Sequence, residues 1–461
     1  MDKISLLKTR KEKQSAACRQ IMGKINAIID AQSFVELDGF SYSHNDFYGE
    51  DVLGEGVVTG YATVNCVPCY MVGINPEVLC GGLSKAGCDK IVKCLDKALV
   101  AGAPVVYLVS SEGILAGEGV DVLEGVAGVL AKMNELSDNV PQFAVASGKV
   151  LGMAAMIFAQ ADYTYYLNGA CVAYASPLVI AAKSNQSLNE EKIGGATNGN
   201  GLCSFVVEDM SEVKDSIVKI LDVLPDYNGI SIDFTDDPNR CCEVLNLNVP
   251  TGECLLNCVF DNSSAIVLNG NVESEVITAI GRIGGYSAAA VIFDGENGVE
   301  LTKGNVEKVK DFMYYAAANN LPIITFVNTL GVKTDSATNS STVLKSVSNL
   351  ICALNYATSV PRINVIYGKA IGLGYTLFGS KAYGADYALA FCNAQISSVS
   401  SAVGAEMEFV LAGGDKAALK AKFEDVDMDA MNGAKCGYLD NVIEPQFVRQ
   451  YIISALQMLI G

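Results

Sequence analysis

One stretch of this chain occurs twice. The first copy, VASGKVLGMAAMIF, covers residues 145–158, and the second, VIYGKAIGLGYTLF, covers residues 365–378, so that Gly368 follows Gly148 by 220 positions. In each copy an apolar run meets a glycine and then a second apolar run, and each copy leads on to the tripeptide Ala-Asp-Tyr. The pattern predicts a buried strand, a tight turn, a helix and then another strand.

Other positions keep nearly the same spacing. Pro322 follows Pro104 by 218 positions and Pro361 follows Pro141 by 220, and a threonine pair is separated by 219. Each proline stands at the start of a short apolar run, as expected at the first residue of a strand. Anchors in one order with a nearly constant offset indicate an internal duplication. We therefore predict an α/β chain with two domains of one fold.

The length of 461 residues leaves room for two such domains. We expect the join within 225–260 and place the domains at 1–235 and 236–461. Inside each domain, the turn between strand and helix has a chemical consequence. The first backbone N–H groups of a helix have no partner within the helix, and with the helix dipole they favour negative charge. Two such turns predict two sites that stabilise an oxyanion, and tight packing without chemistry is the alternative.

Composition excludes several function classes. The formal net charge of −19 argues against binding to nucleic acid or to an anionic membrane surface. The charged N-terminus has no apolar signal core, and no run of apolar residues is long enough to span a membrane. The 15 cysteines in so long a chain favour a reducing compartment over a disulfide framework. We expect a cytoplasmic protein.

Histidine and cysteine patterns give no metal site. The chain has a single histidine, His44, which leaves no multi-histidine site and no Ser-His-Asp triad unless His44 serves one. Cys66 and Cys69 form a CxxC motif without a second pair, and they interrupt a predicted β-hairpin. We interpret this motif as a hairpin turn and expect no bound metal.

The order of the motifs resembles that of the carboxyltransferase subunit of biotin-dependent acyl-CoA carboxylases and of the related acyl-CoA decarboxylases. The family has a strand followed by G-G-S-L and a helix, similar to Gly81-Gly82-Leu83 here. Its second-domain run K-A-x-G-G-A-Y is similar to KAIGLGY at residues 369–375. The resemblance covers nearly the whole chain, and its order and spacing are more specific than any single motif.

The resemblance implies two tandem crotonase-like domains, each a β-β-α superhelix, and a reaction without a histidine base. One pair of backbone N–H groups would hold the thioester oxygen of an acyl-CoA as an enolate, and this pair falls on Gly152 and Met153. The second pair would hold the ureido oxygen of biotin and falls on Leu373 and Gly374. Biotin itself would accept the α-proton.

The resemblance also implies that Gly81, Gly82, Gly113 and Thr376 bind the coenzyme A thioester substrate. Lys149 and Lys369 stand at equivalent places after Gly148 and Gly368, where an ammonium can meet a CoA phosphate or a carboxylate; ordinary exposed lysines are the alternative. The chain departs from the family pattern at several of these places. Its first turn keeps one glycine of a usual pair, and Leu373 stands where a glycine is usual. The loop that contains Gly113 lacks the family's arginine, and Thr376 stands where many members carry an aspartate that selects the acyl size.

The resemblance implies several partners. No Met-Lys-Met attachment sequence and no ATP-grasp pattern occur here, so biotin would sit on a separate biotin carboxyl carrier protein. A biotin carboxylase or a membrane decarboxylase subunit would be a further chain. Because each half-site lies on a different domain, we expect a homo-oligomer, a dimer or a trimer of dimers, or an assembly mixed with a paralogous subunit.

Two other functions stay open at this point. The first is a catalytically impaired structural paralogue within a biotin-dependent complex, suggested by the altered glycine turns. The second is a crotonase-type hydratase or isomerase, which would place carboxylates beside the substrate. Neither residues 148–160 nor 368–380 contain Asp or Glu, and this absence counts against a hydratase.

Overall fold

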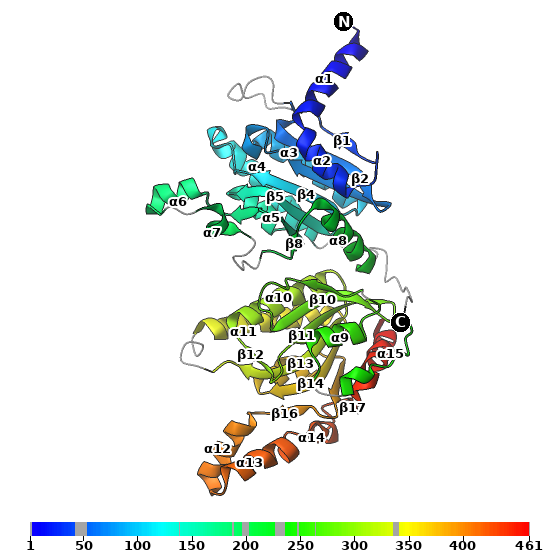
Figure 1. The fold of residues 1–461 in the computed structure, drawn as a ribbon, viewed down its shortest axis with the longest axis vertical. Coiled ribbons are helices and arrows are strands. Elements are labelled where there is room, and N and C mark those ends of the chain that lie inside the picture. The colour runs from blue at the N-terminus through cyan, green and yellow to red at the C-terminus, as the bar shows by residue number, and fades with distance from the viewer. Residues whose placement is uncertain are drawn as a thin grey trace. The chain divides into compact units, whose positions relative to one another are not determined.

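The computed structural model describes residues 2–41, 53–137, 139–186, 189–195, 202–225, 236–246, 249–262, 264–334 and 341–460. The single histidine, His44, lies outside the described residues. The chain folds as two compact units, Met1–Asp222 and Val223–Gly461 (Figure 1). Each unit is an α/β body built around its own sheet.

The first unit contains a mixed sheet whose strands run in the order β1-β2-β3-β4-β5-β6-β8, with β7 beside β5. The first three strands pair antiparallel, and the strands from β3 onward pair parallel. The strands are β1 Val35–Leu37, β2 Val57–Val64, β3 Val67–Ile74, β4 Val105–Ser111, β5 Gln142–Leu151, β6 Tyr163–Leu167, β7 Cys171–Ala173 and β8 Phe205–Val207.

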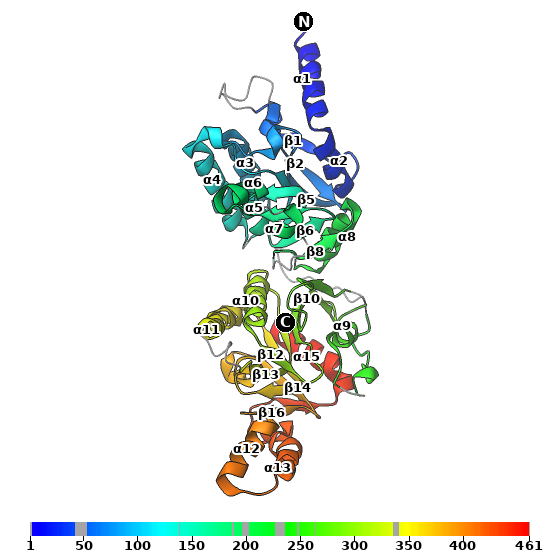
Figure 2. The ribbon, with the colours of Figure 1, turned by 60° about the vertical axis from the view of Figure 1, so that its left-hand side comes forward.

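Helices cover both faces of this sheet. On one side lie α3 and α4, and on the other lie α2 and α8 (Figure 2). The buried residues of α3 include Ile91, Leu95 and Ala98, which recur at helical spacing and face the sheet. The helices of this unit are α1 Lys3–Ala17, α2 Arg19–Ile28, α3 Lys85–Ala101, α4 Val120–Ser137, α5 Met153–Ala159, α6 Pro177–Ser184, α7 Glu190–Gly194 and α8 Met210–Val223.

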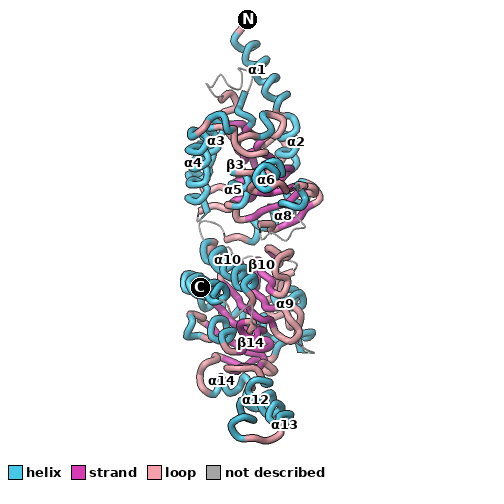
Figure 3. Tube along the Cα trace, turned by 90° about the vertical axis from the view of Figure 1, so that its left-hand side faces the viewer, coloured by secondary structure: helices cyan, strands magenta, loops and turns pink. Residues whose placement is uncertain are grey.

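The second unit has the same plan, with strands in the order β17-β15-β14-β13-β11-β10-β9, with β12 beside β13 and β16 beside β14. Figure 3 shows strands of this unit, among them β10 and β14, in magenta. The strands are β9 Ile266–Leu268, β10 Val276–Ile283, β11 Tyr286–Phe293, β12 Val299–Leu301, β13 Ile323–Val332, β14 Arg362–Ile371, β15 Tyr387–Phe391, β16 Gln395–Ser397 and β17 Asn441–Ile443. The helices are α9 Gly252–Val259, α10 Lys303–Ala318, α11 Ser341–Tyr356, α12 Ser401–Ala412, α13 Lys416–Lys422, α14 Ala430–Lys435 and α15 Val448–Ile460.

Strand register confirms the internal duplication. In the first unit Val105 of β4 pairs with Gln142 of β5, and in the second Ile323 of β13 pairs with Arg362 of β14. Both pairings lose their regular register at equivalent places, after Val109 in one unit and after Val327 in the other. A β-bulge re-aims the strand that follows it. The two bulges therefore set the direction in which β5 and β14 enter their turns.

The duplication extends to a buried lysine. Lys90 of α3 and Lys308 of α10 lie 218 positions apart and are 1% and 9% exposed. Lys90 donates to the carbonyl oxygen of Val57, and Lys308 donates to that of Val276 at 2.6 Å, so each lysine closes the start of a strand. Desolvation by burial lowers the pKa of Lys308 to about 8.

The CxxC motif begins in the turn of the predicted hairpin, but only Cys66 lies in that turn, since Val67, Pro68 and Cys69 belong to β3. Val64 pairs with Val67 across a two-residue loop, and the loop residues Asn65 and Cys66 both have positive φ, 48° and 67°. Positive φ at both central residues is the signature of a type I′ turn. The side chain of Asp30 fixes this turn, because it accepts the N–H of Cys66 at 2.8 Å and the N–H of Asn65 at 3.1 Å.

Within the described ranges, no helix is long and apolar enough to cross a membrane. Nor do those ranges contain a group of three or more His, Cys, Asp or Glu side chains arranged to hold a metal ion.

Candidate functional site: two strand-to-helix turns

The two predicted turns form as expected, each around a glycine with positive φ. Strand β5 ends at Leu151, Gly152 has φ 63°, and α5 begins at Met153. Strand β14 ends at Ile371, Gly372 has φ 52°, and a short helical turn follows from Tyr375 to Gly379. Only glycine adopts this left-handed region without strain. Gly372 is therefore the counterpart of Gly152, a role that the sequence prediction did not give it.

Hydrogen bonds within the protein determine which backbone amides at these turns remain available to a ligand. The N–H of Gly152 donates to the carbonyl of Ala173 at 3.1 Å, and the N–H of Gly372 donates to that of Ser397 at 2.8 Å. The prediction of Gly152 as a donor to a ligand does not fit this bond. In the part of the chain that the structure describes, the N–H groups of Met153 and Ala154 at the first turn, and of Leu373 and Gly374 at the second, have no protein acceptor.

These four amides are two equivalent pairs. Leu373 corresponds to Met153 and Gly374 corresponds to Ala154 at the offset of 220. By this offset, the pair in the first unit that is equivalent to Leu373 and Gly374 is Met153 and Ala154, one residue later than the predicted pair Gly152 and Met153. Applying the repeat offset to Gly374 would have found Ala154 from the sequence alone.

A hydroxyl group holds the loop beside each turn. Ser111 Oγ accepts the N–H of Gly113 at 3.0 Å, and Thr329 Oγ1 accepts the N–H of Gly331 at 3.1 Å. Both hydroxyls are buried, since Ser111 is 1% exposed and Thr329 is fully buried. Each glycine lies against the end of the strand that feeds the turn. A Cβ on Gly113 would lie 3.6 Å from Leu151 O, and a Cβ on Gly331 would lie 3.0 Å from the equivalent oxygen.

Gly81 and Gly82 lie beside the same loop. Gly81 ends a run of positive φ that begins at Leu79, and a Cβ on it would lie 2.2 Å from the carbonyl oxygen of Ser110. Such a distance forbids any side chain at Gly81. After Gly82, the N–H of Leu83 donates to the carbonyl of Gly113 at 2.9 Å. The structure thus brings Gly81, Gly82 and Gly113 next to the first turn.

Lys149 and Lys369 occupy equivalent positions just before the turns. Lys149 is exposed, and its ammonium lies 3.8 Å from Glu112, too long for a hydrogen bond. Lys369 is partly buried, and its backbone N–H donates to Asn328 Oδ1 at 2.9 Å. Thr376 is exposed, and its hydroxyl donates to the carbonyl of Gly372 at 3.2 Å.

The bulges differ in how their polar groups are satisfied. Asn328 is 1% exposed and bridges the second bulge, because it accepts from Lys369 and donates to Gly295 O at 2.6 Å. Its counterpart in the first unit is Ser110. Next to the second bulge, Tyr367 donates to Phe293 O at 2.6 Å, whereas the hydroxyl of its counterpart Ser147 is buried without a partner.

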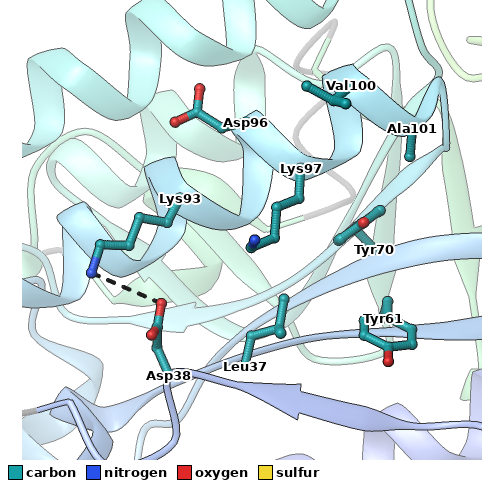
Figure 4. A pocket seen from close by; sticks show the side chains of 9 residues that line it. All are labelled: Leu37, Asp38, Tyr61, Tyr70, Lys93, Asp96, Lys97, Val100 and Ala101. Atoms are coloured by element: carbon teal, nitrogen blue, oxygen red, sulfur yellow. Dashed lines mark ion pairs between the residues drawn. The ribbon is translucent and has the colours of Figure 1, made fainter.

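A surface groove of about 770 Å³ lies elsewhere in the first unit (Figure 4). It is lined by the end of β1, by Tyr61 and Tyr70 of the hairpin, and by one face of α3, where Lys93 lies 4.0 Å from Asp38. None of the predicted site residues lines it. The turns, and not this groove, bring the predicted residues together.

Comparison with known proteins identifies the family. Residues 14–460 match the model of the carboxyl transferase domain. The chain is 30% identical to the methylmalonyl-CoA decarboxylase subunit alpha of Veillonella parvula, over 98% of this chain and 92% of that protein. It is 27% identical to the carboxyltransferase subunit of propionyl-CoA carboxylase from Haloferax mediterranei, over 95% of this chain and 89% of that protein.

A solved structure supports the same assignment of fold. The transcarboxylase 12S hexamer, with methylmalonyl-coenzyme A and methylmalonic acid bound, superposes with a TM-score of 0.91 at 22% identity. The match covers 98% of this chain and 94% of that one. The chain belongs to the carboxyl transferase domain family. The predicted crotonase-like fold and the predicted class of enzyme, a carboxyltransferase, are confirmed.

Proposed function

We propose that this chain moves a carboxyl group between biotin, carried on a separate protein, and a short-chain acyl-CoA of the propionyl or methylmalonyl class. The observation that carries the proposal is the pair of equivalent helix starts, at each of which two successive amides, Met153 and Ala154 or Leu373 and Gly374, have no protein acceptor among the described residues. The relatives' names supply the substrate class, since they include a methylmalonyl-CoA decarboxylase and a propionyl-CoA carboxylase.

The first turn, in this proposal, binds the acyl-CoA. The N–H groups of Met153 and Ala154 point out of the start of α5, where the helix dipole adds to their partial positive charge. They hold the thioester oxygen, which becomes negatively charged when the α-carbon loses its proton. A preorganised donor of this kind contributes about 3–4 kcal/mol to lowering the barrier.

The second turn, in this proposal, binds biotin through the N–H groups of Leu373 and Gly374. Biotin supplies the carboxyl group and accepts the α-proton. The chain's own task is to hold the ureido oxygen and to exclude competing bases. The absence of Asp and Glu from 148–160 and 368–380 fits a reaction in which no carboxylate acts as base.

Side chains around the turns would set the substrate. Lys149 is exposed and Lys369 partly exposed before equivalent turns, where an ammonium can meet a CoA phosphate or a substrate carboxylate. Gly81, Gly82 and Gly113 give close backbone approach next to the first turn. Thr376 is exposed and is the second residue of the helical segment Tyr375–Gly379, where it would limit the acyl group.

We also propose that the active enzyme is a homo-oligomer, a dimer or a trimer of dimers, in which one copy's first turn meets another copy's second turn. Apolar side chains on α6 and α12 support this proposal. Leu178 of α6 is 79% exposed, and Val410 and Leu411 of α12 are 74% and 86% exposed. Apolar surface of this kind favours burial against another chain. Further partners would be a biotin carrier protein and a biotin carboxylase or a membrane decarboxylase subunit.

The test is an assay of the purified chain with its native biotin carrier and a panel of short acyl-CoAs. Wild-type protein should transfer carboxyl groups, and Met153→Ala should retain most of this activity because the N–H remains. Met153→Pro removes the donor, and proline is tolerated at a first helical position. We expect a loss of about 10²–10³ in kcat with an unchanged Tm and oligomer size. A folded wild-type protein without any transfer would instead support the structural paralogue.

A further inference from the structure

The two units contain an exchange of side-chain size at equivalent places. In the first unit Ser111 stands beside the turn whose second amide belongs to Ala154. In the second unit Thr329 and Gly374 occupy these positions, at offsets of 218 and 220. Threonine has one methyl group more than serine, and glycine has one methyl group fewer than alanine. The extra methyl group therefore belongs to Ala154, in the turn, in the first unit, and to Thr329, beside the turn, in the second.

The methyl group of Thr329 fills the place of a side chain on Gly374. A Cβ built on Gly374 would lie 2.3 Å from Thr329 Cγ2, well inside van der Waals contact. Thr329 cannot turn away cheaply, because its hydroxyl donates to Val299 O at 2.8 Å and accepts from Gly331 at 3.1 Å. A β-branched side chain with both branches held has a single χ1 rotamer available. The methyl group is therefore fixed against the Cα of Gly374.

We infer that Thr329 is a positioning residue for the second turn, and that its methyl group sets the place of the Gly374 amide. This inference rests on the proposed function, in which the Gly374 N–H binds biotin. The loop that holds Thr329 is itself anchored on both sides. Asn328 ties it to the bulge of β14 by accepting the N–H of Lys369. On the other side, a Cβ built on Gly331 would lie 3.0 Å from Ile371 O, so the backbone of the loop packs closely against the end of β14. The hydroxyl positions the loop, and the methyl group positions the turn.

Four variants of the full-length oligomer test this inference. Gly374→Ala should push the turn off Thr329 and lower kcat by about 10²-fold, the lower range for loss of one oxyanion donor. The KM for acyl-CoA should stay at its wild-type value, because the other turn binds that substrate. The double variant T329S/G374A recreates the Ser–Ala pair of the first unit, and it should recover most of the lost kcat. Thr329→Val keeps the shape but loses the two hydroxyl bonds, so it should lower kcat without rescue by Gly374→Ala.

The first unit supplies the matched control. Ser111→Thr adds the methyl group beside Ala154, and S111T/A154G recreates the pair of the second unit. Here the defect and its rescue should appear in the KM for acyl-CoA together with kcat, because this turn binds acyl-CoA. A residue with a merely structural role would lower Tm without this difference between the two units.

Two results would overturn the inference. One is a Gly374→Ala variant as active as wild type, and the other is a double variant no better than Gly374→Ala alone. If wild-type protein shows no transfer at all, the proposed function fails. The contact between the Thr329 methyl group and position 374 can still be tested, through the thermal stability of the variants. In that case the Tm lost in Gly374→Ala should return in T329S/G374A, and a Tm that does not return would sink the inference independently.

Discussion

The second turn is more firmly held by its own unit than the first. Asn328 bridges the second bulge with two hydrogen bonds and Tyr367 reaches Phe293 O. At the same places the first unit has Ser110 and Ser147, and the hydroxyl of Ser147 is buried without a partner. The comparison teaches that duplication preserved the backbone of the turns, while each unit found its own way to satisfy the polar groups around them.

The largest expected effect is the loss of kcat when one amide donor is deleted at either turn, and the reaction step that is lost should differ between the two turns. Leu373 follows Gly372 as Met153 follows Gly152, so Leu373→Pro is the matched partner of Met153→Pro. Each variant deletes one amide donor, and each should lower kcat by about 10²–10³, equivalent to roughly 3–4 kcal/mol. Gly374→Pro is less suitable, because its Cβ would also meet Thr329.

The two proline variants should fail differently. Met153→Pro should lose exchange of the acyl-CoA α-proton with solvent, measured by NMR in deuterated buffer. Leu373→Pro should chiefly slow release of carbon dioxide from carboxybiotin, measured with the carrier protein. Identical losses in both assays would contradict the separation of roles, and Met153→Ala and Leu373→Ala serve as controls that keep both amides.

The next prediction compares how the two buried lysines, Lys308 and Lys90, make the stability of the fold depend on pH. Lys308 has a pKa of about 8 in the folded chain, below the ordinary value of 10.5, because burial disfavours its charge. Between these values the unfolded chain binds a proton that the folded chain does not, so this group's contribution to stability rises with pH. The full shift is worth up to about 3 kcal/mol.

Chemical denaturation from pH 7.5 to 10.5 would measure this contribution. The unfolding free energy of wild type minus that of Lys308→Met should increase across this range. Lys90→Met is the matched variant in the first unit. Burial lowers the pKa of Lys90 as well, but Glu36, Cys18, Asp38 and Cys94 all oppose the lowering, whereas Glu273 opposes it at Lys308. The difference for Lys90→Met should therefore rise less than that for Lys308→Met. A flat difference for Lys308→Met would show that the ammonium is not desolvated.

The third comparison concerns the bulges. Asn328→Ala leaves the Lys369 N–H and the Gly295 carbonyl without their buried partner, and should lower the unfolding free energy by about 1–3 kcal/mol. Ser110→Ala removes a smaller side chain with no such bridge, and should cost less than about 1 kcal/mol. Urea unfolding of both variants measures the difference. Equal costs would mean that the Asn328 bridge adds nothing to the second unit.

The sequence predicted the duplication and both turns because they rest on local pattern and a constant offset. Glycines at 152 and 372 indicate positions where the backbone needs a positive φ, and apolar runs indicate strands and helices. It did not predict that the Gly152 amide is used by Ala173, because that bond joins β7 to the turn across the fold. The hydroxyls of Ser111 and Thr329 were missed for the same reason. A serine or threonine in an apolar strand carries no signal of the loop that it holds.

The smallest expected effect on stability concerns the buried Ser147 hydroxyl and its counterpart, the hydroxyl of Tyr367. Tyr367→Phe removes the hydrogen bond to Phe293 O and leaves that carbonyl without it, so the variant should lose about 1 kcal/mol of unfolding free energy. Ser147→Ala removes a buried hydroxyl that has no acceptor, and replacing an unsatisfied polar group by an apolar one of similar size is neutral or stabilising. The two variants should therefore shift Tm in opposite directions, or Ser147→Ala should leave it unchanged. A Tm that falls equally in both would show that Ser147 does have a partner, such as a bound water, and that the two units satisfy this position equally well.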